Sequence, residues 1–396
     1  MSELSDGQKV KVLTISILLT DFDVLLLDEP TNNLDIPSTI WLESYLKASK
    51  KNIIVVSHDT DFLESICNKV VYLDWKLKTV RVSKGKYSDF LEMYHKSRLQ
   101  QEINYKNYLK EKKRLESAAM DLKVKSQRGS AFKGTDNDKN LRGFKRERAG
   151  KSGRKASTIK TRIENLEKVK RPVNEKEMTM ELDPDHLNVS LDIADLKIKA
   201  GGKTFGPYSM YLPSGSLMVI VGSNGTGKST FLDCLRGDIP PYSGRLKYLG
   251  NPIICNFSQA QQALIKFMDA LDFIGSNINL ETSKLHHILA MHGIDEEAAT
   301  EDISSLSPGQ KARVLFAYIS ALRANVLLLD EPPNHLDLEG QNALISMINE
   351  YRGIAVLVTH DRNLLRSVRK EFAYEFTMTG ARRIPNLDAY LNSIQY

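Results

Sequence analysis

The chain has 396 residues, 41% of them hydrophobic, and a formal net charge of +6 at pH 7. This length and hydrophobic content support two or three packed domains. Apolar segments end at Thr20 and Asp28, before the roughly 20 residues that cross a bilayer, and no basic segment precedes an apolar one at the N-terminus. Cys67, Cys234 and Cys255 lie singly in apolar runs. The composition argues against membrane spans, secretion, disulfides and a cysteine metal site.

The positive charge is concentrated in one segment. Residues 95–172 contain 24 Lys and Arg against 9 Asp and Glu, a net charge of +15, which leaves −9 for the rest of the chain. Charge runs are often only solvated faces. A local excess of this size on an acidic body favours a partner with a phosphate backbone.

The first part of the chain has an α/β pattern. From Leu4 to about Lys86, helix-like stretches alternate with apolar segments that predict strands at 24–27, 53–56 and 70–73. Such alternation is typical of parallel sheets.

The strand pattern stops at about Tyr87. Helical spacing predicts helices at 100–122 and 157–169, and the basic stretch 126–155, rich in Gly and Ser, is expected to form an irregular tip between them. A disordered tether is the alternative. After Pro172 the α/β pattern returns. We therefore expect domains at 1–90, 91–172 and 173–396.

The segment GSNGTGKST matches a phosphate-binding loop, because it follows the apolar strand 217–221 and precedes a helix-compatible segment. In such loops the backbone N–H groups surround phosphates. Lys228 would contact the β- and γ-phosphates, and the Ser229 hydroxyl would bind Mg²⁺. The residues expected to bind nucleotide are Gly222, Ser223, Asn224, Gly225, Thr226, Gly227, Lys228, Ser229 and Thr230.

Two carboxylates follow the predicted strand 326–329. Asp330 can hold Mg²⁺ directly or through water, and Glu331 is the natural candidate to polarise an attacking water. A DE pair alone marks many ordinary strand ends. Here the pair precedes the segment PPNHLD, and this position singles it out as a candidate site.

Several motifs occur twice, although the phosphate loop occurs once. The second series is FSQ (257–259), LSPGQ (306–310), VLLLDEPPNHLD (326–337) and VTHD (358–361); the first is LSDGQ (4–8), VLLLDEPTNNLD (24–35) and VSHD (56–59). Together they resemble a twin ATP-binding cassette protein of the F branch whose first cassette lacks its nucleotide-binding half. The expected fold is α/β, with P-loop cassettes joined by a helical-hairpin linker.

The resemblance implies function as well. Members of this branch carry no membrane domain and are cytoplasmic ATPases that bind the exit-tRNA region of the ribosome and extend the linker toward its catalytic centre. Some promote translation and others displace ribosome-targeting antibiotics. The linker segments DNDK (136–139) and RGFKRERA (142–149) are similar to the linker tip of bacterial members. The resemblance implies ATP, Mg²⁺ and ribosomal RNA and tRNA as ligands, with antibiotic resistance as one possible role.

In this superfamily ATP lies between the phosphate loop of one cassette and the signature loop of the other. The resemblance implies one complete composite site, with Gln259 at the metal and the reacting water, and His360 beside Glu331. The first cassette would close it with Ser5, Gly7, Gln8 and Asp35. The second composite site lacks a phosphate loop. The residues that would belong to it are therefore expected to have no function, and they are Asp28, Glu29, His58, Ser307 and Gly309.

The sequence departs from the family pattern in places. Asp6 and Pro308 replace the first glycine of each signature, and Pro333 replaces a usual threonine. Phe205 is a weak substitute for the aromatic residue that stacks on adenine. A first cassette without its loop, strand and helix is expected to leave apolar faces uncovered.

Three functions therefore remain open. The leading one is an ATPase acting on the ribosome, whose missing half a separate chain could supply. A non-hydrolysing RNA-binding remnant is the second. The third, a soluble ATPase subunit of a transporter, does not account for the basic linker.

Overall fold

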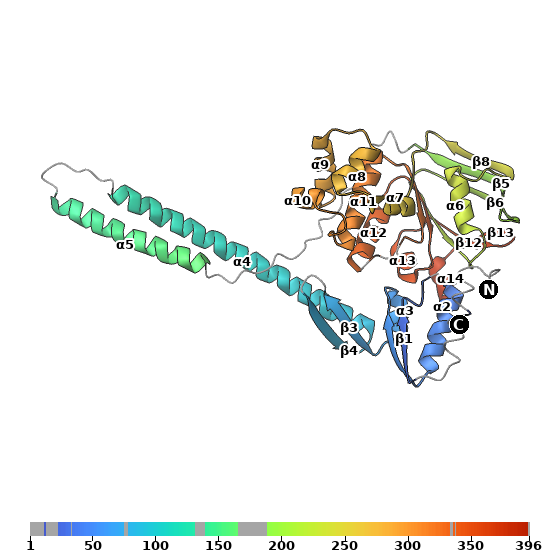
Figure 1. The fold of residues 1–396 in the computed structure, drawn as a ribbon, viewed down its shortest axis with the longest axis horizontal. Helices are drawn as coiled ribbons and strands as arrows, with labels where there is room; N and C mark the ends of the chain where they lie inside the picture. The colour runs from blue at the N-terminus through green and yellow to red at the C-terminus, as the bar shows by residue number, and fades with distance from the viewer. Residues whose placement is uncertain are drawn as a thin grey trace. The chain divides into compact units, whose positions relative to one another are not determined.

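The computed structural model describes residues 12, 23–32, 34–74, 78–130, 139–164, 188–332, 336 and 338–394. The chain divides into two compact units, residues 1–69 with 175–396, and residues 70–174 (Figure 1). Within the first unit we call residues 23–69 the first half and residues 188–394 the second cassette. The predicted α/β class is confirmed, because helices cover mostly parallel sheets. No helix within the described ranges is long and apolar enough to span a membrane.

The second cassette is built on a six-stranded sheet with the order β13-β12-β7-β11-β10-β9. Only β12 and β13 pair antiparallel. The strands are β7 (Leu217–Val221), β9 (Ile254–Asn256), β10 (Val326–Asp330), β11 (Ile354–Val358), β12 (Phe372–Thr377) and β13 (Gly380–Arg383). A separate antiparallel sheet contains β5 (Ser190–Ala200), β6 (Lys203–Leu212) and β8 (Ser243–Leu249).

Both faces of the large sheet are covered. Every residue of β7 and β11 is buried, which explains why these strands are continuous apolar runs rather than alternating ones. Leu217 and Val219 point into a core formed with the helices of one face, whereas Met218 and Ile220 point into a core formed with β5, β6 and α6. The helices are α6 (Lys228–Arg236), α7 (Phe257–Leu264), α8 (Ala270–Asn277), α9 (Thr282–Met291), α10 (Glu296–Thr300), α11 (Pro308–Leu322), α12 (Leu338–Glu350), α13 (Arg362–Ser367) and α14 (Leu387–Ile394).

The first half repeats part of the second cassette without insertion or deletion. Its elements are β1 (Val24–Asp28), α2 (Ile36–Ala48), β2 (Asn52–Val56) and α3 (Thr60–Ile66). Each position corresponds to one 302 residues later, as Val24 does to Val326. The parallel pairing has the same register in both copies, Val24 with Asn52 and Val326 with Ile354. The repeated motifs therefore reflect repeated structure.

The two copies differ in how their sheets are covered. In the first half Leu26 is 71% and Ile54 59% exposed, whereas their counterparts Leu328 and Val356 are fully buried. The second cassette buries the equivalent side chains against β5, β6 and α6, elements for which the described first half has no counterpart. The expected uncovered apolar face is present.

The second unit is a helical hairpin that begins with a β-ribbon (Figure 1). β3 (Lys69–Asp74) and β4 (Thr79–Lys84) lead into α4 (Tyr87–Ser130), which packs along α5 (Lys139–Glu164). The boundary near residue 70 lies before the predicted one at 90 because Tyr72 of β3 packs its ring 5.3 Å from that of Phe90 in α4. The ribbon therefore belongs with the hairpin.

The predicted helical hairpin is present, but both helices are longer than expected. The stretch 126–155, expected to be irregular, is helical at 126–130 and 139–155. Its Gly and Ser residues suggested a loop, whereas Lys and Arg have good intrinsic helix propensity and contact with α4 stabilises the pair. Most of DNDK, and residues 165–187, lie outside the described residues.

Candidate nucleotide site

The phosphate loop connects the end of β7 to the start of α6, as predicted. Gly222 has φ of 143°, and a Cβ atom there would lie 2.3 Å from the carbonyl oxygen of Phe376. Gly227, the residue before α6, has φ of 87°, and a Cβ atom there would lie 2.6 Å from the ring of Phe205. Both positions require glycine. The loop therefore has the tight backbone that a phosphate cradle needs.

Lys228 folds back over this loop. Its Nζ donates to the carbonyl oxygens of Gly222 at 2.6 Å and Ser223 at 3.0 Å. Burial lowers the pKa of Lys228, and the negative charges of Glu331, Asp35 and Asp330 oppose that change. The ammonium group is thus surrounded by carbonyl dipoles and carboxylates at the mouth of the loop, where phosphate oxygens could replace the carbonyls as its partners.

The two predicted metal ligands are adjacent. Asp330 ends β10 and accepts a hydrogen bond from the Ser229 hydroxyl at the start of α6; burial raises the pKa of Asp330, and this bond and Lys228 oppose the increase. A carboxylate and a hydroxyl are hard oxygen donors of the kind that Mg²⁺ uses alongside phosphate oxygens and water. No cluster of three His, Cys, Asp or Glu with metal-ligand geometry occurs in the described part of the chain. The residues fit Mg²⁺ brought in with a nucleotide.

Glu331 is held by two backbone contacts and one side chain. Its N–H donates to the carbonyl oxygen of Val358 at 2.9 Å, and its Oε2 accepts from the N–H of His360 at 3.2 Å. Nε2 of His360 lies 3.6 Å from Oε1. Burial raises the pKa of Glu331 to about 8, although the His360 N–H and Lys228 lower it. This residue has φ of 46°, a strained value that fixes the carboxylate direction.

Gln259 lies in the first turn of α7, where its N–H donates to the side chain of Asn256 at 3.4 Å, and it is exposed. Its neighbour Ser258 was not singled out from the sequence. The Ser258 hydroxyl donates to the carbonyl oxygen of Asp330 at 2.8 Å. This bond ties the first turn of α7 to the end of the strand that carries Asp330 and Glu331. A serine between two motif residues gave no signal by itself.

Asp35 brings the first half to the phosphate loop. One carboxylate oxygen caps α2 by accepting from the N–H of Ser38 at 3.2 Å, and the other accepts from the N–H of Asn224 at 3.3 Å. This bond places a first-half carboxylate at the phosphate loop. The other residues that the first cassette is expected to contribute, Ser5, Gly7 and Gln8, lie outside the described residues, as does Pro333.

Glu29 and His58 of the first half reproduce the local geometry of Glu331 and His360. Glu29 has φ of 45°, and its carboxylate accepts from the N–H of His58 at 3.4 Å. Nε2 of His58 lies 3.4 Å from Oε1 of Glu29. The opposing signature is folded too, since Ser307 caps α11 and forms a reciprocal box with Gln310. Pro308 occupies the first turn, where proline is compatible with the helix.

Phe205 is not available to stack on adenine. Its ring is 6% exposed and packs in the core below Gly227. The face of the ring is therefore used for packing beside the loop.

Comparison with known proteins identifies the class. A family model described as "ABC transporter" matches residues 205–334. The chain is 30% identical over 380 residues to "ATP-binding cassette sub-family F member 3" of Mus musculus, which covers 93% of this chain and 49% of that protein. It is 30% identical over 387 residues to "Probable ATP-binding protein YheS" of Escherichia coli strain K12, covering 93% and 54%. The chain spans about half the length of these curated relatives.

Solved structures show the same fold. The "RNase-L Inhibitor" matches with a TM-score of 0.55 and 19% identity, covering all of this chain and 67% of that one. A structure titled as the complex of archaeal ribosomal stalk protein aP1 and archaeal ribosome recycling factor aABCE1 matches with a TM-score of 0.55 and 18% identity, with the same coverage. The chain thus carries an ATP-binding cassette domain. The resemblance to the F sub-family is confirmed along 93% of its length.

Proposed function

We propose that the chain binds and hydrolyses ATP with Mg²⁺ at a site shared by its second cassette and first half, and that it acts on the ribosome. The observation that carries the first part is the bond from Asn224 N–H to Asp35, because it brings a first-half carboxylate to the same loop as Lys228. A phosphate loop with a nearby carboxylate pair is what phosphoryl transfer to water requires.

In the proposed mechanism the triphosphate takes the place of the carbonyl partners of Lys228. Mg²⁺, held through Ser229 and Asp330, would neutralise charge on the β- and γ-phosphates. Glu331 would orient a water and accept its proton on the carboxylate, and His360 would keep that carboxylate in position through its backbone N–H and its ring. Gln259 lies in the first turn of α7 next to Ser258, whose hydroxyl bonds to the Asp330 carbonyl, and would orient the water from the other side.

The test is ATP turnover by the full chain, with and without ribosomes. Lys228→Ala removes the charge at the β- and γ-phosphates and should abolish tight ATP binding in isothermal titration. Lys284→Ala is the control, since this exposed lysine lies on α9 and pairs with Glu281 at the start of the same helix. Parental ATP affinity in Lys228→Ala would reject the site. Tight ATP binding without turnover in the parent would favour the non-hydrolysing remnant.

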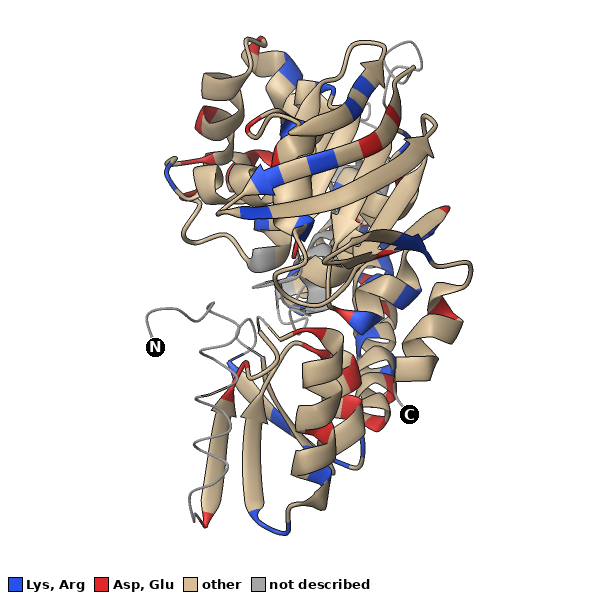
Figure 2. Cartoon of the chain, turned by 90° about the vertical axis from the view of Figure 1, so that its right-hand side faces the viewer, with Lys and Arg blue, Asp and Glu red and all other residues tan. Residues whose placement is uncertain are grey.

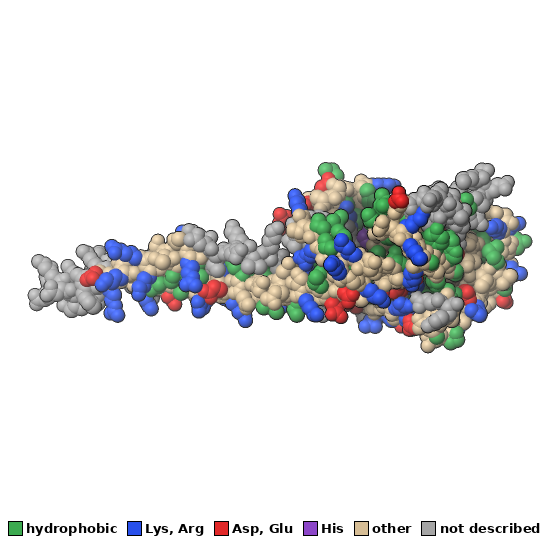
Figure 3. Space-filling view, turned by 90° about the horizontal axis from the view of Figure 1, so that it is seen from below, with side chains coloured by type: hydrophobic (Ala, Val, Ile, Leu, Met, Phe, Trp, Pro, Cys, Tyr) green, Lys and Arg blue, Asp and Glu red, His purple; other side chains and the backbone are tan. Residues whose placement is uncertain are grey.

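The ribosomal part of the proposal rests on the hairpin and on the titles of related structures. One neighbour is described as an archaeal ribosome recycling factor, and another as part of a ribosome-bound complex, with a TM-score of 0.53. Residues 95–172 carry a net charge of +15, and Figure 3 shows Lys and Arg along the exposed hairpin. Such a surface fits RNA phosphates.

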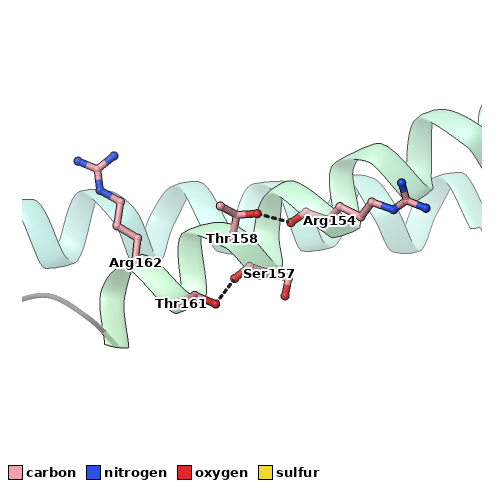
Figure 4. A pocket seen from close by; sticks show the side chains of 5 residues that line it. All are labelled: Arg154, Ser157, Thr158, Thr161 and Arg162. Atoms are coloured by element: carbon pink, nitrogen blue, oxygen red, sulfur yellow. Dashed lines mark hydrogen bonds between the residues drawn. The ribbon is translucent and has the colours of Figure 1, made fainter.

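The hairpin also has a groove of about 700 Å³ (Figure 4), lined by Arg154, Ser157, Thr158, Thr161 and Arg162 of α5. The hydroxyls of Thr158 and Thr161 donate to helix carbonyls, at 3.0 Å and 3.2 Å. Arg154 and Arg162 supply the guanidinium groups of this face, and Arg162 also lies 3.9 Å from Oε1 of Glu111 in α4. Guanidinium is well suited to phosphate. We propose this face as one contact with ribosomal RNA or tRNA. Translation control and antibiotic protection are both compatible with it.

We further propose that a polypeptide with its own phosphate loop completes the first half, either as a preceding part of the protein or as a separate chain. In the second cassette β5, β6 and α6 cover the counterparts of Leu26 and Ile54. The described first half has no counterpart of these elements. A partner that supplies them would cover Leu26 and Ile54. Co-expression with a cassette N-terminal half should lower binding of a hydrophobic dye, and unchanged dye binding would reject the proposal.

A further inference from the structure

A group of charged residues, partly buried, joins the first half to the second cassette. None of its members belongs to the phosphate loop. Its basic members are on α13, and its acidic members are on α2 and at the start of α3. We call it the inter-half cluster, and it consists of Glu43, Asp59, Asp61, Arg362 and Arg366. Figure 2 colours the acidic and basic residues of these helices red and blue.

Arg362 is the centre of the inter-half cluster. Its side chain is 2% exposed and donates a hydrogen bond to Glu43, which is also buried. Its guanidinium nitrogens lie 3.9 Å from Oδ1 of Asp59 and 3.7 Å from Oδ2 of Asp61. A guanidinium this deeply buried is stable only when carboxylates compensate its charge.

Arg366 extends the contact to the surface. Its Nη1 donates to both carboxylate oxygens of Asp61, at 3.1 Å and 2.9 Å. Asp61 therefore bridges two arginines, one buried and one 37% exposed. Close pairs of this kind across an interface set which partner is accepted more than they set overall affinity.

The contact is made by equivalent parts of the repeat. α3 of the first half packs on α13 of the second cassette, and Thr60 and Arg362, which begin these helices, correspond through the offset of 302 residues. Elements that contact their own counterparts are related by an approximate two-fold axis. A second copy of the second cassette could therefore present the same surface to α13.

The charges distinguish the first half from a second copy of the second cassette as the partner of α13. At the positions of Glu43 and Asp61 the second cassette has Ile345 and Asn363, and at the position of Glu64 it has Arg366. A pair of second cassettes would thus bury Arg362 without two of its carboxylates and bring basic residues together. An uncompensated buried charge strongly disfavours such a pair.

We propose that the inter-half cluster is a pairing surface that selects the first half as the partner of the second cassette and rejects a second copy of that cassette. The surface acts through charge. It does not depend on the proposed ATPase activity.

The test uses hydrogen–deuterium exchange of α2 and α3 in the full chain without nucleotide. Double variant Glu43→Ile/Asp61→Asn gives the first half the residues of the second cassette. We expect exchange in α2 and α3 to become faster by about tenfold or more, since a buried arginine loses its partners. Exchange at the parental rate would show that the surface does not discriminate, and would overturn the proposal.

Exchanging the charges of Asp61 and Arg366 distinguishes loss of this specific pairing from a general loss of folding. Asp61→Arg and Arg366→Glu should each speed exchange in α2 and α3. The double variant should lose less protection than the sum of the two single losses, because the exposed pair is restored while Arg362 still lacks the carboxylate of Asp61. The control exchanges Asp192 and Arg245, which pair at 2.8 Å within the second cassette, and should leave α2 and α3 unchanged. Additive loss in the Asp61/Arg366 double variant, or no effect of either single change, would overturn the proposal.

Discussion

Oε2 of Glu331 accepts a hydrogen bond of 3.2 Å from the backbone N–H of His360. The same bond joins His58 to Glu29 at 3.4 Å in the first half. The two carboxylates therefore have the same local support. They differ in charge environment, because Lys228 lies close enough to Glu331 to affect its pKa.

This difference predicts that the same substitution has a large effect at Glu331 and a small effect at Glu29. Glu331→Gln should retain ATP binding and reduce the turnover number by about 100-fold or more, because an amide cannot accept the proton of the attacking water. Glu29→Gln should change turnover by less than about twofold. Steady-state phosphate release measures both. Equal losses would mean that a partner completes the site at Glu29.

The raised pKa of Glu331 predicts a pH dependence of catalysis. With a pKa of about 8, the carboxylate of the free protein is mostly protonated at neutral pH and cannot act as a base. We expect kcat/KM for ATP to rise with pH, to reach half of its plateau near pH 8 and to level off about one pH unit higher. Glu331→Gln should remove this rise, and a parental profile in that variant would assign the ionisation to another group.

The same shift predicts a pH dependence of stability. Burial raises the pKa of Glu331 from its ordinary 4.5 to about 8, so between these values the folded chain binds more protons than the unfolded one. The free energy of unfolding should therefore fall as pH rises from about 4.5 to 8. In urea titrations Glu331→Gln should weaken this fall. A stability that increases across this range because of Glu331 would contradict the assignment.

Asp35 allows the contact between the halves to be separated from helix capping. Asp35→Asn keeps a capping oxygen for Ser38 but presents an amide to the N–H of Asn224. We expect little change in the melting temperature and an increase of about tenfold in KM for ATP. Asp35→Ala should also lower stability by about 1 kcal/mol. Parental kinetics in Asp35→Asn would exclude a role for this contact.

Neutralising four hairpin residues tests the RNA partner. Changing Lys145, Arg146, Arg148 and Lys151 to Gln should weaken ribosome binding and lower the slope of log K against log salt by roughly one for each lost phosphate contact. The control changes exposed lysines of the second cassette, Lys203, Lys247, Lys266 and Lys284. If the variant pellets with ribosomes as well as the parent does across a salt series, the hairpin charges only keep the hairpin solvated. Basal ATPase should be unaffected in either case.

Local features of this protein followed from local sequence. The glycines at 222 and 227, the lysine after them and the DE pair after an apolar strand predicted the loop and its neighbours, because close backbone approach and strand ends impose specific residue types. The hairpin was predicted with helices that are too short. Gly and Ser between residues 126 and 155 indicate a loop locally, whereas packing of α5 along α4 compensates for their low propensity.

The sequence by itself determined the cassette repeat, the phosphate loop, the basic hairpin and the carboxylate pair for which we propose roles in metal binding and catalysis. Only the tertiary structure showed that Ser258 supports Asp330 and that Arg362 is compensated by Glu43, Asp59 and Asp61. The reason is sequence separation. A charge pair such as Arg362 and Glu43 joins residues 319 positions apart, and the local sequence around one does not predict the other. Their pairing is set by tertiary packing, with α2 on α3 and α3 on α13.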